Sequence, residues 1–87
     1  MQRRPPWDRV RDRELKHLAQ ADREIAHLNK RIARQKLIIQ AAIVNGRASV
    51  EAESLLRALD ACRRAFEMHR QLIVSLLENA GIPPRSE

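Results

Sequence analysis

A seven-residue spacing of aliphatic side chains constrains this chain more than any other feature of its sequence. The first row of these residues is Leu18, Ile25, Ile32 and Ile39. A second row follows three residues further on and contains Ala21, Leu28, Gln35 and Ala42. On an α-helix this spacing places both rows on one face, which packs along another helix. The sequence therefore predicts a long amphipathic helix with a helical partner.

Residues that begin and end helices mark the limits of this segment. Residues 1–7 are rich in arginine and proline, and we expect them to form a flexible basic arm. Asp8 can accept hydrogen bonds from the first free amides of a helix, which is expected over about residues 9–45. Asn45 and Gly46 stop this helix, because glycine readily adopts the left-handed conformation that closes a helix.

A second helix is predicted after a turn at residues 46–48. Ser49 suits its N-cap, and Gly81 followed by two prolines ends it, so it covers about residues 49–80. Its own seven-residue repeat contains Ala52, Leu59, Phe66, Ile73 and Ala80. The row that we expect beside it in the seam contains Leu55, Cys62, His69 and Leu76.

Two long helices joined by so short a turn fold back on each other. We therefore predict an all-α fold of two long antiparallel helices, a single helical-hairpin domain over residues 8–81 with residues 82–87 as a tail. One Trp, one Phe and no Tyr argue against a sheet, since strands favour aromatic residues. The predicted layers are Ile39 with Leu55, Ile32 with Cys62, Ile25 with His69, and Leu18 with Leu76.

Each helix carries more apolar surface than one neighbour can cover. The most apolar stretches, Leu37–Val44 beside the turn and Leu72–Leu77 at the open end, lie at opposite ends of the hairpin. Two hairpins whose turns lie at opposite ends bring these stretches together, which predicts an antiparallel homodimer that forms a four-helix bundle. A parallel dimer, a higher oligomer or a different protein partner remains an alternative. The expected core and interface residues are Leu18, Ile25, Leu28, Ile32, Leu37, Ile38, Ile39, Ile43, Leu55, Leu56, Leu59, Cys62, Phe66, His69, Leu72, Ile73, Leu76 and Leu77.

The net charge of +6 comes entirely from the first half, where residues 1–46 hold 11 Lys and Arg against 5 acids. Part of this excess forms a basic ridge on the first helix: Arg9, Arg13, Lys16, Arg23, Lys30 and Arg34. Such a ridge can contact the phosphates of a nucleic acid without reading sequence. A solvated outer face is the interpretation that we favour, because no aromatic residue interleaves the ridge to stack on bases. An anionic membrane surface or an acidic partner is a further alternative.

Histidine and cysteine do not form a recognisable site in the sequence. His17, His27 and His69 fall on different faces or levels of the predicted helices, so we expect no metal and no cofactor. Cys62 and His69 lie in the predicted seam, and we expect both to be core residues. His69 would then need a hydrogen-bond partner such as Asp22, Asn29 or a residue of the second copy.

Catalysis and membrane insertion find no support in the sequence. It shows no nucleophile paired with a base, no paired carboxylates and no glycine-rich phosphate loop, so we expect no enzyme. One cysteine and the lack of an apolar N-terminal segment favour a cytoplasmic protein. The longest mostly apolar run has eight residues, whereas about 20 are needed to cross a bilayer, so we predict no membrane span.

A family resemblance rests on two segments of the chain. One runs from His17 to Gln35 and includes Arg31-Ile32-Ala33-Arg34-Gln35; the other is Ala52-Glu53-x-Leu55-Leu56-x-x-Leu59. Together they resemble a group of short, largely uncharacterised helical-hairpin proteins of rhizobia and related alphaproteobacteria. The resemblance implies a bacterial cytoplasmic setting and no catalytic residues. Our functional prediction is a non-enzymatic module for helical oligomerisation and protein–protein interaction, compatible with a regulatory role.

Overall fold

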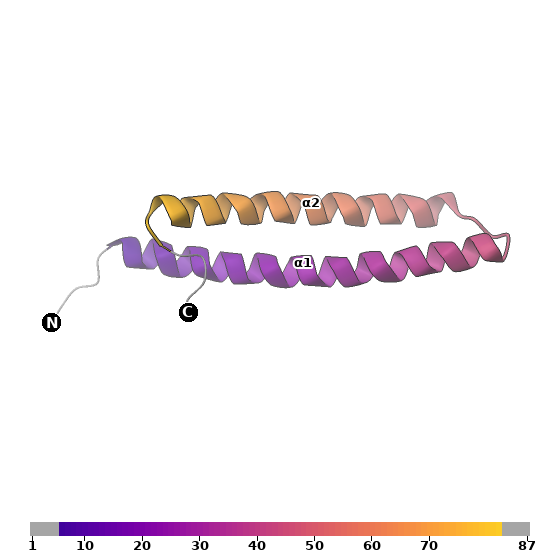
Figure 1. Cartoon of the computed structure of the whole chain (residues 1–87), viewed down its shortest axis with the longest axis horizontal. Coiled ribbons are helices and arrows are strands. Elements are labelled where there is room, and N and C mark those ends of the chain that lie inside the picture. The colour runs from indigo at the N-terminus through magenta and orange to yellow at the C-terminus, as the bar shows by residue number, and fades with distance from the viewer. Residues whose placement is uncertain (1–5, 83–87) are drawn as a thin grey trace.

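The computed structural model describes the backbone of residues 6–82 and the side chains of residues 8–82. Helix α1 runs over Pro6–Val44 and helix α2 over Val50–Asn79. The two lie side by side and antiparallel, joined by a tight turn at one end (Figure 1). Residues 6–82 contain no strand. The prediction of an all-α helical hairpin is confirmed.

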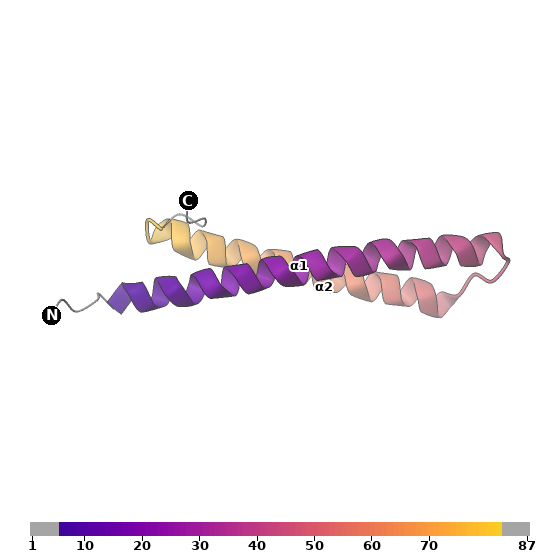
Figure 2. The same ribbon diagram turned by 90° about the horizontal axis from the view of Figure 1, so that it is seen from below.

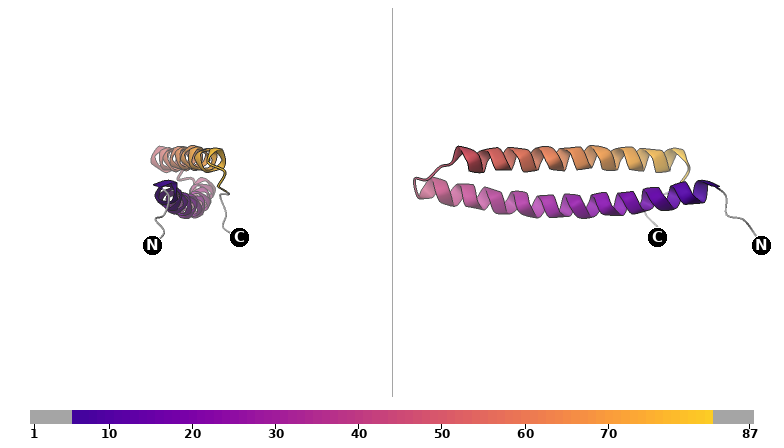
Figure 3. Two further views of the ribbon diagram at one scale, coloured as in Figure 1. Left: turned by 90° about the vertical axis from the view of Figure 1, so that its left-hand side faces the viewer. Right: turned by 180° about the vertical axis from the view of Figure 1, so that it is seen from behind.

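The hairpin is a single layer of two helices that cross at a shallow angle (Figure 2). Viewed along its length, one helix lies directly above the other with no third element beside them (Figure 3). Its radius of gyration is 18.9 Å, whereas a compact chain of this length has about 12 Å. Each helix is therefore covered on one side only.

Both predicted rows of α1 face α2. Five of their residues are buried: Leu18, Ala21, Leu28, Ile32 and Gln35. Ile25, Ile39 and Ala42 are half-buried in the same rows. The seven-residue repeat thus identifies the covered face of the first helix, because 3.6 residues per turn return both rows to one side.

The expected seam of α2 is partly wrong. Its central row is correct, with Leu59 and Ile73 buried and Phe66 half-buried. A different row from the predicted one completes the seam beside the central row. It lies on the other side of the central row and contains Leu56, Arg63, Arg70 and Leu77. The predicted flanking residues are all exposed: Leu55, Cys62, His69 and Leu76. Both flanking rows carry a leucine at each end, and a single neighbouring helix can cover only one of them.

The contacts follow this rotation of α2. Leu18 packs in one cluster with Ile73, Val74 and Leu77, where Leu76 was expected. A second cluster joins Leu28 and Ile32 to Leu59, with Leu56 and Phe66 packed against it, where Cys62 was expected. The half-buried Arg63 and Arg70 lay their aliphatic stems along this seam while their charged ends reach acidic partners at its edge.

Gln35 is the one buried polar residue among the core positions of the described chain. Its Nε2 donates a hydrogen bond of 2.9 Å to the backbone carbonyl oxygen of Ala52 on α2. This bond satisfies the amide and ties α1 to the first turn of α2.

The turn between the helices begins with a glycine-based helix end. Gly46 has a φ of +68°, its N–H donates to the Ile43 carbonyl at 3.0 Å, and the Arg47 N–H donates to the Ala42 carbonyl at 2.6 Å. This is the Schellman arrangement, which satisfies carbonyls that the last turn leaves free. Ser49 then caps α2, with its Oγ accepting a hydrogen bond of 3.2 Å from the Ala52 N–H.

The C-terminal end of α2 has the same glycine-based arrangement as the end of α1. Gly81 has a φ of +72°, and the Ile82 N–H donates to the Leu77 carbonyl at 2.8 Å. Ile82 packs on the Leu18 cluster, so it belongs to the folded domain and not to the predicted tail. At the other end α1 begins at Pro6, inside the predicted arm, because proline is tolerated in the first turn of a helix. Asp8 accordingly lies in that turn. Residues 1–5 and 83–87 lie outside the described chain.

Replacing Gly46 tests how much the turn depends on its left-handed backbone. No atom lies within 4 Å of a Cβ built at this position, so the cost of Gly46→Ala comes from the backbone alone. We expect a loss of about 1–2 kcal/mol in the free energy of unfolding, measured by urea denaturation. Gly46→Asn should lose less, because asparagine tolerates this conformation better than alanine. An alanine variant as stable as the unchanged protein would contradict this account of the turn.

Candidate interaction surface

An uncharged row on α2 lies outside the hairpin seam, and we refer to it as the α2 stripe. Its residues alternate in steps of three and four, so that they share one side of the helix. They are Leu55, Ala58, Cys62, Ala65, His69, Leu72 and Leu76. All seven are exposed, including Leu72 at 69% and Leu76 at 49%. The stripe runs for about 32 Å at 1.5 Å per residue.

This much aligned apolar surface is unusual on a chain with so small a core. Single exposed hydrophobic residues are normal on monomers, whereas contiguous apolar patches mark interaction sites. None of the seven residues of the stripe is Asp, Glu, Lys or Arg. It therefore has the composition of a helix face that packs on another helix.

A shallow pocket of about 200 Å³ borders the stripe on the side of α1. It is lined by His17, Gln20, Ala21, Phe66 and His69. His17 Nδ1 lies 3.5 Å from a carboxylate oxygen of Glu14. The structure thus brings two histidines together that sequence reasoning had placed apart, because the antiparallel register sets His17 level with the C-terminal half of α2.

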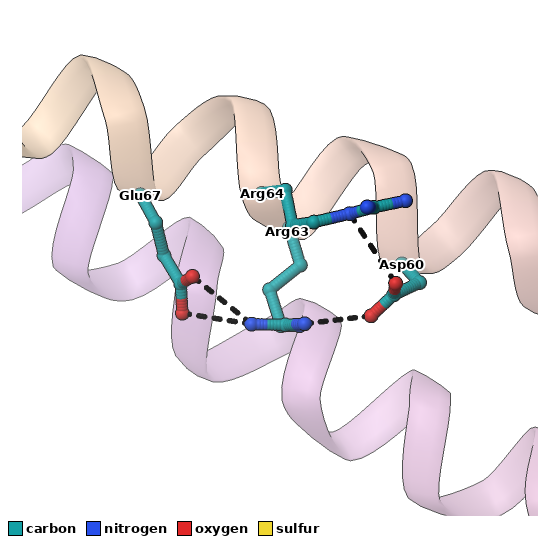
Figure 4. A network of polar contacts seen from close by, with 4 residues as sticks. All are labelled: Asp60, Arg63, Arg64 and Glu67. Atoms are coloured by element: carbon teal, nitrogen blue, oxygen red, sulfur yellow. Dashed lines mark hydrogen bonds and ion pairs between the residues drawn. The ribbon is translucent and has the colours of Figure 1, made fainter.

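The other edge of α2 is strongly charged. Arg63 donates to Asp60 at 2.6 Å and to both carboxylate oxygens of Glu67 at 3.0 Å (Figure 4). Arg64 Nε lies 3.3 Å from the second oxygen of Asp60. The hydrogen bond from Arg63 holds the pKa of Asp60 below its usual value, and the neighbouring cations act in the same direction. The two acids in turn raise the pKa of Arg63. Ion pairs dominate this edge.

An ion pair ties the two helices together on the same charged edge. Arg70 Nε donates to the carboxylate of Asp22, across 48 positions of sequence. Asp22 is one of the possible partners that the sequence offers for His69. It binds Arg70 because α2 is rotated so that Arg70 faces α1 and His69 does not.

All six residues of the basic ridge are exposed on α1: Arg9, Arg13, Lys16, Arg23, Lys30 and Arg34. Helical periodicity places them away from the rows that face α2. Arg13 Nε lies 3.5 Å from Glu14. The ridge extends for about 37 Å along the helix, and the one Phe, Trp or Tyr among residues 8–82, Phe66, lies on α2.

The remaining candidates from the sequence are placed as follows. Leu37, Ile38 and Ile43 are exposed near the turn. Cys62 is an exposed thiol and not the core residue that was expected. In the described residues, no group of three or more His, Cys, Asp and Glu side chains is placed to hold a metal ion.

Neither α1 nor α2 has a segment long and apolar enough to cross a membrane, as judged on the part of the chain that the structure describes.

No protein-family model matches this chain, and no curated protein or solved structure matches it either. The resemblance to short alphaproteobacterial proteins stays a prediction.

The depressed pKa of Asp60 predicts how the charged edge responds to acid. A carboxyl whose pKa is lower in the folded state stabilises the fold above its unfolded pKa of about 3.8, and this contribution disappears as pH falls through the folded value. We expect Asp60→Asn to lower the thermal midpoint slightly at pH 7, and the difference from the unchanged protein to disappear as the pH falls below about 3.8.

Thermal unfolding followed by circular dichroism measures this difference. The control is the same Asp60→Asn change in an Arg63→Gln background, where the difference at pH 7 should shrink because the main partner of the carboxylate is gone. A difference independent of both pH and Arg63 would refute the assignment.

Proposed function

We propose that this chain is a non-enzymatic helical interaction module of the cytoplasm whose first partner is a second copy of itself. Two hairpins with their turns at opposite ends form an antiparallel four-helix bundle. The observation that carries this proposal is the α2 stripe. Its seven uncharged residues span positions 55–76 of α2, and α1 leaves all of them exposed.

The size of the hairpin supports a dimer. The 30 residues of α2 span about 45 Å, and with a molecular width of 18 Å one face of the hairpin measures about 800 Å². A standard protein–protein interface buries about 800 Å² on each partner. One hairpin face therefore offers the area that a stable dimer needs.

The energies point the same way. Fully burying an exposed leucine contributes about 1.5–3 kcal/mol, and each copy offers the partly exposed Leu55, Leu72 and Leu76. Across two copies this amounts to roughly 5–10 kcal/mol, which is comparable with the cost of association, about 4–15 kcal/mol. The rest of the face must contribute as well, so we expect the dimer to be specific and dependent on concentration.

Sedimentation equilibrium tests the proposal directly. We expect a mass twice the 10.1 kDa of the chain at micromolar concentration, with dissociation on dilution. Helical circular dichroism should weaken together with the dimer, since each hairpin has only a thin core of its own. A folded species of single-chain mass over the whole concentration range would overturn the proposal.

The exposed basic ridge supports a second candidate, nonspecific binding of nucleic acid. If its six cations contact phosphates, the logarithm of the affinity should fall with the logarithm of salt at a slope of about −5. Fluorescence anisotropy with labelled duplexes of two unrelated sequences measures this slope, and equal affinities are expected. Flotation with anionic vesicles tests whether the ridge binds a membrane surface instead of nucleic acid. Absence of binding at low salt would leave the ridge as solvated surface.

A further inference from the structure

We infer that the α2 stripe pairs with the α2 stripe of a second copy in antiparallel orientation, about a twofold axis that passes close to Ala65. The inference rests on the proposed self-association and specifies the face and the register that it uses. It assigns the centre of the bundle to α2 against α2.

The order of residues along the stripe is self-complementary when one copy is reversed. Leucines occupy both ends, at Leu55 and Leu76, and small residues occupy the middle. Reversal about Ala65 sets two larger side chains of one copy level with smaller ones of the other, Leu72 against Ala58 and His69 against Cys62, and it pairs Leu55 with Leu76 at the ends. Alternating large and small side chains allows two helices to interdigitate closely.

A parallel pair would not pack in this way. It would place Leu72 against Leu72 and Ala58 against Ala58, so that crowded layers alternate with empty ones. The antiparallel pair avoids this mismatch at Leu72 and Ala58.

The flank of α1 beside the stripe carries complementary charge in the same register. His17 lines one pocket with His69 of the stripe, so its side of α1 borders the interface. The row that continues from His17 in steps of seven is Glu24, Arg31 and Ile38. Glu24 is half-buried and Arg31 is exposed. An acid and a base therefore lie one repeat apart on the flank.

The contacts within the hairpin locate the axis on α1. Asp22 is bonded to Arg70 and Ile32 packs in one cluster with Leu59, so Ala65 lies level with residues 26–27 of α1. The midpoint between Glu24 and Arg31 falls at almost the same level. A twofold axis through Ala65 thus brings Glu24 of each copy toward Arg31 of the other, which gives two symmetrical ion pairs at the rim.

The opposite face of the hairpin does not suit this role. It carries the ion pairs of Asp60, Arg63, Arg64 and Glu67 and that of Asp22 with Arg70. Packing a second hairpin there would remove these charges from water, a cost that their mutual attraction repays only with excellent geometry.

The orientation is tested by cross-linking single cysteines with a short bismaleimide, in a Cys62→Ala background. Ala65→Cys places both thiols near the axis and should cross-link efficiently. Leu55→Cys and Leu76→Cys should each fail alone, because each lies about 30 Å from its own copy along the helix. A mixture of these two variants should cross-link, since the reversed register brings position 55 of one copy toward position 76 of the other.

Arg64→Cys is the matched control, because it lies at the same level as Ala65 on the charged face and should not cross-link. Leu55→Cys cross-linking to itself would overturn the inference in favour of a parallel pair. A stable dimer in which Ala65→Cys fails to cross-link would also overturn it, while leaving self-association intact. If the unchanged chain is a monomer in sedimentation, that result contradicts the proposed self-association and with it this inference.

A pair of equally exposed leucines tests the face independently of cross-linking. Leu72 on the stripe is 69% exposed, and Leu37 near the end of α1 is 66% exposed. Periodicity places Leu37 away from the stripe side of the hairpin. Leu72→Lys should raise the dissociation constant of the dimer at least about tenfold, with Leu37→Lys changing it by less than about threefold. Equal effects of the two substitutions would contradict the assignment of the interface, and far-UV circular dichroism at high concentration checks that both variants fold.

Discussion

The packing of α1 on α2 through two small clusters is the interaction on which the rest of this structure depends. Leu18 with Ile73 and Leu77 joins the helices near the open end, and Ile32 with Leu59 joins them toward the turn. These contacts decide how α2 is rotated about its own axis. Because α2 is apolar on two adjoining sides, that rotation determines which side is covered and which remains available to a partner.

The structure separates polar and apolar surface across the two edges of the hairpin seam. On one edge, Arg63 and Arg70 flank the seam and form ion pairs with Asp60 and Asp22, so this edge is charged. On the other edge lie the α2 stripe and the shallow pocket between His17 and His69. A helical hairpin with one charged edge and one apolar edge can add a second layer in one direction only. In the proposed assembly this asymmetry favours a closed pair over an open stack.

Most of the architecture is predictable from local rules. Gly46, Gly81 and Ser49 place the helix ends, because the left-handed backbone and the capping hydroxyl are properties of single residues and their neighbours. The repeat of Leu18, Ile25 and Ile32 identifies the covered side of α1, since only one side of that helix carries large aliphatic residues along its whole length. The exposed position of the basic ridge follows from the same periodicity.

What the sequence by itself determined is two amphipathic helices, their ends and their antiparallel return. Only the tertiary structure decided that Leu56 and Leu77, and not Leu55 and Leu76, complete the seam of α2. The two choices differ by one residue step and each offers two leucines, but the covered row holds Arg63 and Arg70 where the other holds Cys62 and His69, so the apolar pattern alone does not predict it. Contacts with α1 decide between them, including the bond from Arg70 to Asp22, and these join residues far apart in the chain. The same choice moved Cys62 and His69 from the expected core to the exposed stripe.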